Sequence, residues 1–149
     1  SSSAASDVYK RQVRETINVQ QGIHLDFSAV VDSETGSSRH HVWALGMPLE
    51  PVGQTKYYDR LLRFDWNKGE VVDAYLTHDD WYLSGEPSIV SAARSDSHGY
   101  LICPAWSATE SRSEYLIFDP YDLESGPVAA LPLSSPSPLA FHSTFARRP

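Results

Sequence analysis

The sequence has little cysteine and no long apolar run. Cys103 is the only cysteine among the 149 residues, so no internal disulfide can form, which fits a reducing compartment or indifference to redox state. This residue is expected to be a small buried strand residue. The longest apolar runs, such as residues 42–45 and 115–118, are far shorter than the roughly 20 residues that cross a bilayer. The sequence therefore indicates no membrane span and leaves peripheral membrane association open.

Positive charge is also scarce. Lys and Arg contribute 12 residues against 19 Asp and Glu, which gives a net charge of −7 at pH 7. Outside the N-terminal region the only adjacent arginines are Arg147 and Arg148. Nucleic-acid backbones are bound by clustered basic side chains. Nucleic acid is therefore not expected as a partner.

The first twelve residues differ from the rest of the chain. Residues 1–6 are of low complexity, and residues 7–12, which read DVYKRQ, resemble the translated end of a transposon used in sequencing libraries. We interpret residues 1–12 as a non-native leader and leave them out of the fold prediction. The native frame is then expected to begin near Val13, and the chain is expected to be an N-terminally truncated fragment.

Beyond Thr16 the pattern is typical of an all-β protein. Short apolar or alternating runs each end at Gly, Pro, Asn, Asp or Ser, and no stretch of helical length has a convincing 3.6-residue period. The proline-rich segment 132–138 is predicted to be a loop, because proline removes ladder donors. The predicted strands are 42–45, 60–64, 71–76, 88–91, 100–104, 115–119, 128–133 and 141–145.

Two segments look like copies of one hairpin. Leu-Arg-Phe-Asp ends at Asp65 and is followed by Gly69, while Leu-Ile-Phe-Asp ends at Asp119 and is followed by Gly126. Aspartate can bond its own downstream backbone and glycine can adopt positive φ, so both favour a reversal between strands. The two aspartates lie 54 positions apart, close to the length of a generous propeller blade. The repeat is compatible with a β-propeller without requiring one.

Four stretches, in order, carry a resemblance to a known family. Together they cover about residues 25 to 145 and are similar to the carotenoid cleavage oxygenase family, also called the carotenoid oxygenase or retinal pigment epithelial membrane protein family. Any one of them alone would be weak, and their joint order makes the match specific. They are 25–27 (LDF), 60–65 (RLLRFD), 85–90 (GEPSIV) followed by 99–102 (GYLI), and 113–119 (SEYLIFD) continuing through 126–129 (GPVA) to 139–142 (LAFH).

The resemblance implies an all-β fold in which residues 13–149 form the C-terminal blades of a seven-bladed β-propeller, as an incomplete fragment. In this family four histidines hold Fe(II) on the propeller axis, with carboxylates behind them. His142 matches the terminal histidine and is the expected metal ligand and catalytic residue. Glu86 matches the Glu-Pro carboxylate and is expected to orient His142; the alternative is an exposed loop glutamate. Asp26 stands where the family usually has a glutamate behind another histidine, and the alternative is a solvated aspartate at a strand end.

Some positions depart from the family pattern. Ala140 and Ser143 replace glycines that flank the terminal Phe-His, which puts the fine geometry in doubt. Aromatic side chains could line a substrate tunnel, but core packing is the preferred interpretation for Trp43, Trp66, Trp81, Trp106, Tyr57 and Tyr58. The remaining histidines do not match ligand positions and are expected to lie at the surface; they are His24, His40, His41, His78 and His98.

The function implied by the resemblance belongs to the parent protein. It is an Fe(II)-dependent dioxygenase that uses O2 to cleave a C=C double bond of a carotenoid, apocarotenoid or related small hydrophobic conjugated substrate. The fragment alone is expected to be inactive, because it offers one matched ligand. Two alternatives stay open: a retinoid isomerohydrolase-type member of the same family, and a non-catalytic β-propeller module for binding or scaffolding.

Overall fold

The computed structural model describes residues 23–31, 40–48, 57–78, 80–90, 99–137, 139–143, 145 and 146. These residues form strands, turns and irregular segments, and none of them is helical. The part of the chain that is described thus contains no helix of the length and apolarity that a membrane crossing requires. The predicted leader, residues 1–12, and its boundary at Val13 lie outside the described residues.

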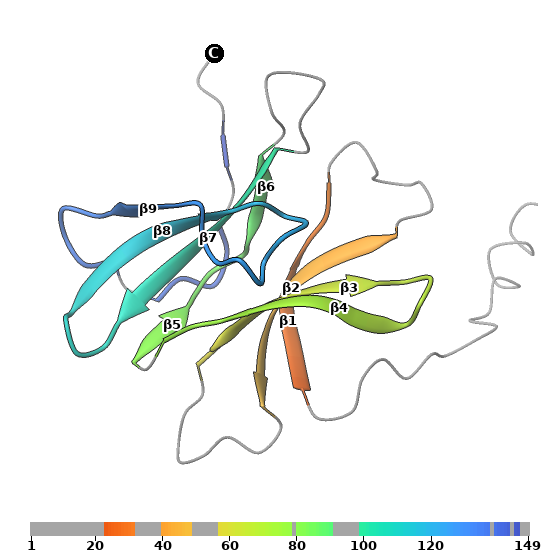
Figure 1. The fold of residues 1–149 in the computed structure, drawn as a ribbon. Coiled ribbons are helices and arrows are strands. Elements are labelled where there is room, and N and C mark those ends of the chain that lie inside the picture. The colour runs from red at the N-terminus through yellow and green to blue at the C-terminus, as the bar shows by residue number, and fades with distance from the viewer. Residues whose placement is uncertain are drawn as a thin grey trace, which may run out of the picture.

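The first sheet is a four-stranded antiparallel meander (Figure 1). It consists of β1 (Ile23–Ala29), β2 (His41–Pro48), β3 (Arg60–Asp65) and β4 (Glu70–Leu76), which pair in chain order. Its strands are short and rich in Leu, Val, Phe and Tyr, which suit a pleated, half-buried surface. The β3–β4 connection is the first of the two predicted hairpins.

The second sheet has one interrupted edge. It contains β5 (Trp81–Leu83), β6 (Ser88–Val90), β7 (Tyr100–Ser107), β8 (Arg112–Phe118) and β9 (Ala129–Pro132), in the order β5-β7-β8-β9 with β6 also paired to β7. Leu83 pairs with Ala105 and Ser88 pairs with Ile102, so β5 and β6 follow each other along β7. Residues 84–87 leave the ladder between them, and Gly85 has a φ of 67° there.

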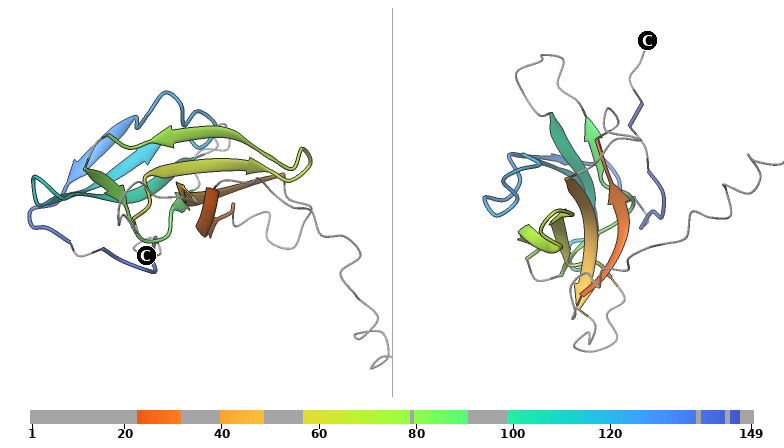
Figure 2. Two further views of the ribbon diagram at one scale, coloured as in Figure 1. Left: turned by 90° about the horizontal axis from the view of Figure 1, so that it is seen from below. Right: turned by 90° about the vertical axis from the view of Figure 1, so that its right-hand side faces the viewer.

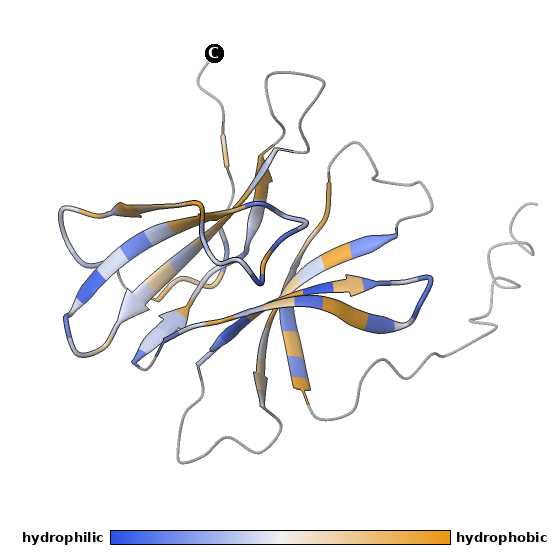
Figure 3. Ribbon diagram, viewed as in Figure 1, coloured by the Kyte–Doolittle hydropathy of each residue, from blue (hydrophilic) through white to orange (hydrophobic). Residues whose placement is uncertain are grey.

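The two sheets pack face to face around one hydrophobic core. Hydrophobic and hydrophilic positions alternate along strands such as β1 (Figure 3), and β7 buries every second residue, as expected when one face of a sheet meets another. Figure 2 shows the two sheets from two further sides. Fully buried core side chains from both sheets are Trp43, Leu45, Leu61, Leu101, Cys103 and Phe118.

The two predicted hairpin copies are confirmed. Asp65 Oδ1 accepts a hydrogen bond from the backbone N–H of Asn67 at 2.9 Å, and Gly69 follows with a φ of 72°. Asp119 Oδ1 accepts from the backbone N–H of Tyr121 at 2.9 Å, and Gly126 has a φ of 81°. Each copy therefore uses its aspartate to start the turn and its glycine to adopt the left-handed conformation.

A polar cluster, which we call the Asp73 latch, joins the second hairpin loop to the first sheet. Asp73 accepts hydrogen bonds from the backbone N–H groups of Leu123, at 3.0 Å, and Glu124, at 3.1 Å. Its carboxylate also pairs with Arg63 Nη2 at 3.3 Å, and both side chains are largely buried. Arg63 lies over the ring of Tyr121 as well. The latch therefore ties β3 and β4 to a loop about 50 residues further along the chain.

Most strand predictions are confirmed, with two omissions and one error. The predictions did not include β1 or the three-residue β5. The described residues of 141–145 form no strand, because the backbone there meets the irregular segment around Gly85 rather than a ladder. The predicted loop at 132–138 is confirmed from residue 133 to residue 137.

The aromatic and cysteine predictions are confirmed in part. Trp43 and Cys103 are fully buried, as expected. The prediction of core packing is wrong for Trp66 and Tyr57, which are exposed by 46% and 43%. Trp66 stands just beyond the end of β3, at the turn, and packs edge-on against Phe64 instead of entering the core.

Candidate functional site

The chain returns to the junction of the two sheets after β9. In the right-hand view of Figure 2 the terminal segment runs beside β1, and the ring of Phe141 lies 6.1 Å from that of Phe27 in β1. The backbone N–H of Gly85 donates to the carbonyl oxygen of Ala140 at 2.8 Å. The terminal segment is thus held between β1, an edge strand of the first sheet, and the interrupted edge of the second.

His142 and Glu86 meet at this junction. His142 Nδ1 lies 2.9 Å from Glu86 Oε1, although the residues are 56 positions apart, so the predicted contact is present. A carboxylate only accepts hydrogen bonds, so the neutral ring donates from Nδ1 and keeps its lone pair on Nε2, on the opposite side. The side chain of His142 is 80% exposed and that of Glu86 is 35% exposed. The contact therefore orients the ring through Nδ1 and leaves Nε2 as the nitrogen that could bind a metal.

Phe27 supports the other side of His142. Its ring lies 6.1 Å edge-on from the imidazole and 5.5 Å from the ring of Tyr58. The backbone of Phe27 has a φ of 50°, and the register of β1 shifts between Asp26 and Ala29. A bulge with positive φ is strained for a bulky residue and persists only where its surroundings hold it. Here it places the Phe27 ring against the terminal segment.

Asp26 lies on the same strand and contacts a tyrosine. Its carboxylate accepts hydrogen bonds from the Tyr58 hydroxyl at 2.9 Å and from the backbone N–H of Phe27 at 2.8 Å. Burial, the hydrogen bond to Asp26 and the charge of Asp26 together raise the pKa of Tyr58 to about 12, so Tyr58 is a neutral donor at ordinary pH. The role of Asp26 behind a second histidine stays a prediction.

An apolar pocket adjoins the His142 site. Its volume is about 190 Å³. Two of its walls, Phe27 and Phe141, belong to the aromatic cluster around His142. Apolar walls with few polar groups are typical of sites for hydrophobic ligands. The pocket is lined by Phe27, Tyr57, Tyr58, Leu83, Ser84, Leu139, Ala140 and Phe141.

The described residues provide one candidate metal ligand at this junction. Among them, no three His, Cys, Asp or Glu side chains come together in a way that could hold a metal ion. His142 could nevertheless hold a metal together with ligands from elsewhere, because a carboxylate lies on its Nδ1.

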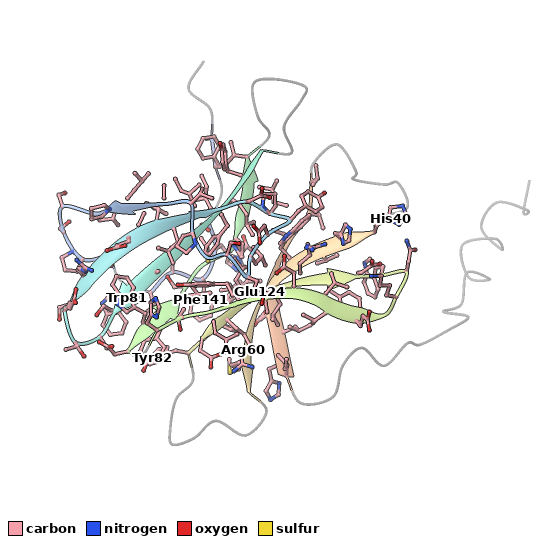
Figure 4. All side chains as sticks on the ribbon, in the orientation of Figure 1. His40, Arg60, Trp81, Tyr82, Glu124 and Phe141 are labelled. Carbon is pink, nitrogen blue, oxygen red and sulfur yellow. The ribbon has the colours of Figure 1, made fainter. Side chains whose placement is uncertain are left out.

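The other histidines lie elsewhere. His40 contacts the side-chain amide of Asn67, at the start of β2 and far from Phe141 (Figure 4). His41 packs near the rings of Trp43 and Tyr121. His24 and His78 are exposed, and His98 lies outside the described residues.

Residues that the sequence analysis did not assign to the site contribute to it. Ser143, noted there only as a departure, bonds the backbone of Glu86 through its hydroxyl. Phe27 was read only as part of a motif, and Gly85 only as the residue before Glu86. The position of Ser143 directly after His142 was the available signal, but a lone serine is common and carries little weight by itself.

Comparisons with known proteins agree with this architecture. The model of a family described as retinal pigment epithelial membrane protein matches residues 4–147. No curated protein matches the sequence significantly. Among solved structures, Pseudomonas brassicacearum lignostilbene dioxygenase is 22% identical with a TM-score of 0.70, covering 82% of this chain and 27% of that one. A mutant of Synechocystis apocarotenoid oxygenase (ACO) is 23% identical with a TM-score of 0.67, covering 83% and 26%. Cobalt-substituted Synechocystis ACO is 23% identical with a TM-score of 0.68, covering 83% and 26%.

These similarities define the fold of the two sheets. Carotenoid oxygenases of this kind are seven-bladed β-propellers, and the chain spans about a quarter of the length of the solved structures it matches. The four-stranded first sheet and the five-stranded second sheet each correspond to a propeller blade, in which antiparallel neighbours pair. The expected fold class, part of a seven-bladed β-propeller, is confirmed.

Proposed function

Because the chain belongs to the carotenoid oxygenase family, whose model is described as retinal pigment epithelial membrane protein, we propose that the protein containing it is an Fe(II)-dependent dioxygenase. Its substrate would be a carotenoid, an apocarotenoid or a related conjugated molecule, cleaved at a C=C double bond. The observation that carries the proposal is the contact of 2.9 Å between His142 Nδ1 and Glu86 Oε1. That contact prepares Nε2 of an exposed imidazole for a metal.

His142 would bind the iron through Nε2, and Glu86 would hold the proton on Nδ1. Imidazole is a ligand that suits iron, and a carboxylate on its second nitrogen both fixes the tautomer and makes the ring more basic. Bound Fe(II) would supply the binding and activation of O2. A solved relative is a cobalt-substituted enzyme, which supports a metal cofactor in this protein as well.

The aromatic surroundings would serve the substrate. Phe27 borders both the imidazole and the apolar pocket, and Phe141 packs against Phe27 and lines the same pocket, so a conjugated chain seated in the pocket would lie close to His142. Apolar walls exclude water and leave few polar groups that a hydrocarbon would have to desolvate.

The scaffold alternative is less well supported. An ordinary core role for Phe141 and His142 would not require Glu86 to lie near the ring. Glu86 Oε1 instead lies 2.9 Å from His142 Nδ1. A carboxylate placed on one nitrogen of an imidazole suits a ligand role better than core packing.

The experiment is iron analysis of variants of the protein expressed from its complete coding sequence. His142→Ala should lose nearly all tightly bound iron. Glu86→Gln should weaken iron binding by about 10- to 100-fold, the usual effect of losing a carboxylate behind a ligand histidine. The exposed His78→Ala is the matched control and should keep the wild-type iron content. Wild-type iron content in His142→Ala would refute the proposed site.

Labelled oxygen separates the two chemistries of the family. With ¹⁸O₂, a dioxygenase places the label in its carbonyl products, whereas an isomerohydrolase does not consume O2. Iron-dependent turnover without incorporation of ¹⁸O from O2 would replace the dioxygenase with the isomerohydrolase alternative.

A further inference from the structure

Ser143 links the terminal segment to Glu86 through a single hydroxyl group. Ser143 Oγ donates to the backbone carbonyl oxygen of Glu86 at 2.6 Å and accepts from the backbone N–H of the same residue at 3.1 Å. Glu86 lies in the segment 84–87, outside the β5 and β6 ladders. Its main-chain groups therefore depend on a side chain for partners that a neighbouring strand would otherwise supply.

We propose that Ser143 is a positioning residue that fixes the backbone of Glu86 so that its carboxylate orients His142. The proposal rests on the proposed function in taking the His142 ring to be a metal ligand. A serine hydroxyl can donate and accept at once on a very short side chain. Alanine or glycine at this position offers neither hydrogen bond.

The fit between the two segments is close. Gly85 N–H donates to the carbonyl oxygen of Ala140, three residues before Ser143, at 2.8 Å. A Cβ atom on Gly85 would lie 3.3 Å from Ser143 Oγ and 3.6 Å from the Cβ of Ala140. Together with the contact between Glu86 and His142, three hydrogen bonds involving Gly85 and Glu86 hold residues 140–143 against residues 85 and 86.

The orientation of His142 depends strongly on these contacts between residues 140–143 and residues 85 and 86. Among the described residues, the ring packs edge-on against Phe27 at 6.1 Å. Its Nδ1 contact with Glu86 is the directional restraint. When Ser143 loses its hydroxyl, the Glu86 backbone gains freedom, and the carboxylate spends less time on Nδ1. The imidazole then divides its proton between both nitrogens.

The test compares Ser143→Ala with Ser143→Thr, which keeps the hydroxyl, and with Ser135→Ala, an exposed loop serine. The protein is expressed from its complete coding sequence. In the metal-free protein, ¹⁵N NMR of labelled histidine measures the fraction of the His142 ring protonated on Nδ1, with His142→Ala used to assign the signal. Cobalt(II) titration with absorption spectroscopy then measures metal affinity and ligand geometry, and thermal unfolding checks the fold.

Ser143→Ala should reduce the fraction protonated on Nδ1 and weaken cobalt binding by about 5- to 10-fold, below the full effect of removing the carboxylate. Ser143→Thr and Ser135→Ala should match the wild type. Ser143→Cys, which nearly preserves size but bonds weakly, provides the same test if the alanine variant does not fold, and should give an intermediate fraction.

The possible outcomes distinguish this inference from the proposed function. A wild-type Nδ1-protonated fraction and cobalt affinity in Ser143→Ala would overturn the role of Ser143, while loss of cobalt binding in His142→Ala would leave the metal site standing. Unchanged cobalt binding in His142→Ala would instead overturn the proposed function. In that case the NMR measurement alone decides whether Ser143 positions the pair.

Discussion

Replacing Asp73 with alanine is expected to open the contact between the two sheets. Asp73 is the centre of the Asp73 latch: it accepts hydrogen bonds from the backbone N–H groups of Leu123 and Glu124 and pairs with Arg63. The carboxylate side chain is only 8% exposed and the Arg63 side chain 14% exposed. Alanine at position 73 removes all three of these interactions and leaves the largely buried guanidinium of Arg63 without its carboxylate.

The expected loss of stability is about 3 kcal/mol. Breaking a buried ion pair from one side costs about 3–5 kcal/mol, because the remaining charge stays desolvated. Two features favour the lower end of that range. Arg63 keeps a long contact with the carbonyl oxygen of Tyr121 at 3.5 Å and its position over the Tyr121 ring. Glu124 is exposed, so water can replace the partner of its N–H. Asparagine retains one acceptor and should lose about half as much.

Hydrogen exchange gives a local measurement of this change. In the protein expressed from its complete coding sequence, amides of residues 121–126 should exchange on the order of 100-fold faster in Asp73→Ala, since each 1.36 kcal/mol changes the opening equilibrium tenfold. The matched control is Asp59→Ala, which removes a 37% exposed carboxylate paired with neighbouring Arg60 and should cost less than about 1 kcal/mol. Exchange within threefold of the wild type in Asp73→Ala would refute the latch.

Three further predictions concern the surroundings of the site. Gly85→Ala should lower the melting temperature, with a cost of about 1–2 kcal/mol, because φ is 67° there and the new Cβ meets Ser143 Oγ at 3.3 Å; an unchanged melting temperature would contradict the close approach. Tyr58 has a pKa raised from 10.0 to about 12, so its stabilising effect should be complete below pH 10 and disappear as the pH rises towards 12; Tyr58→Phe should lose less stability over that interval, as unfolding curves at several pH values can show. Cys103 is fully buried, and burial raises the pKa of its thiol, so a thiol reagent should modify it only after unfolding; rapid modification of the native protein would show that the core opens there.

Much of the fold follows from local patterns. The hairpins at Asp65 and Asp119 could be predicted because the turn chemistry, an aspartate and a downstream glycine, is written into neighbouring residues. The strand β1 was harder to predict, although Ile23–Ala29 alternates between apolar and polar residues. Its outward positions are largely exposed and its register is broken at Phe27. Three-residue β5 is too short to show any period.

The site was predictable only in part. Glu86 and His142 could be paired because their motifs resemble those of a family in which such residues meet; nothing in local patterning joins positions 56 apart. The strand predicted at 141–145 was wrong for a related reason. Phenylalanine and threonine are common in strands, but the segment that residues 141–143 contact, around Gly85, is itself irregular and offers them no ladder.

Segments of irregular backbone meet at this junction. This explains both why the junction can hold the candidate site and why sequence patterns do not predict it. Phe27 adopts a positive φ in a bulge, Gly85 adopts one where β5 and β6 separate, and the segment carrying His142 pairs through Ser143 instead of a ladder. Regular strands direct side chains above and below a sheet, whereas a ligand histidine and its carboxylate must point toward each other from separate segments. The hydrophobic core between the two sheets supplies the stability that permits such strained positions. Periodicity predicts the sheets and misses the junction because only the sheets are periodic.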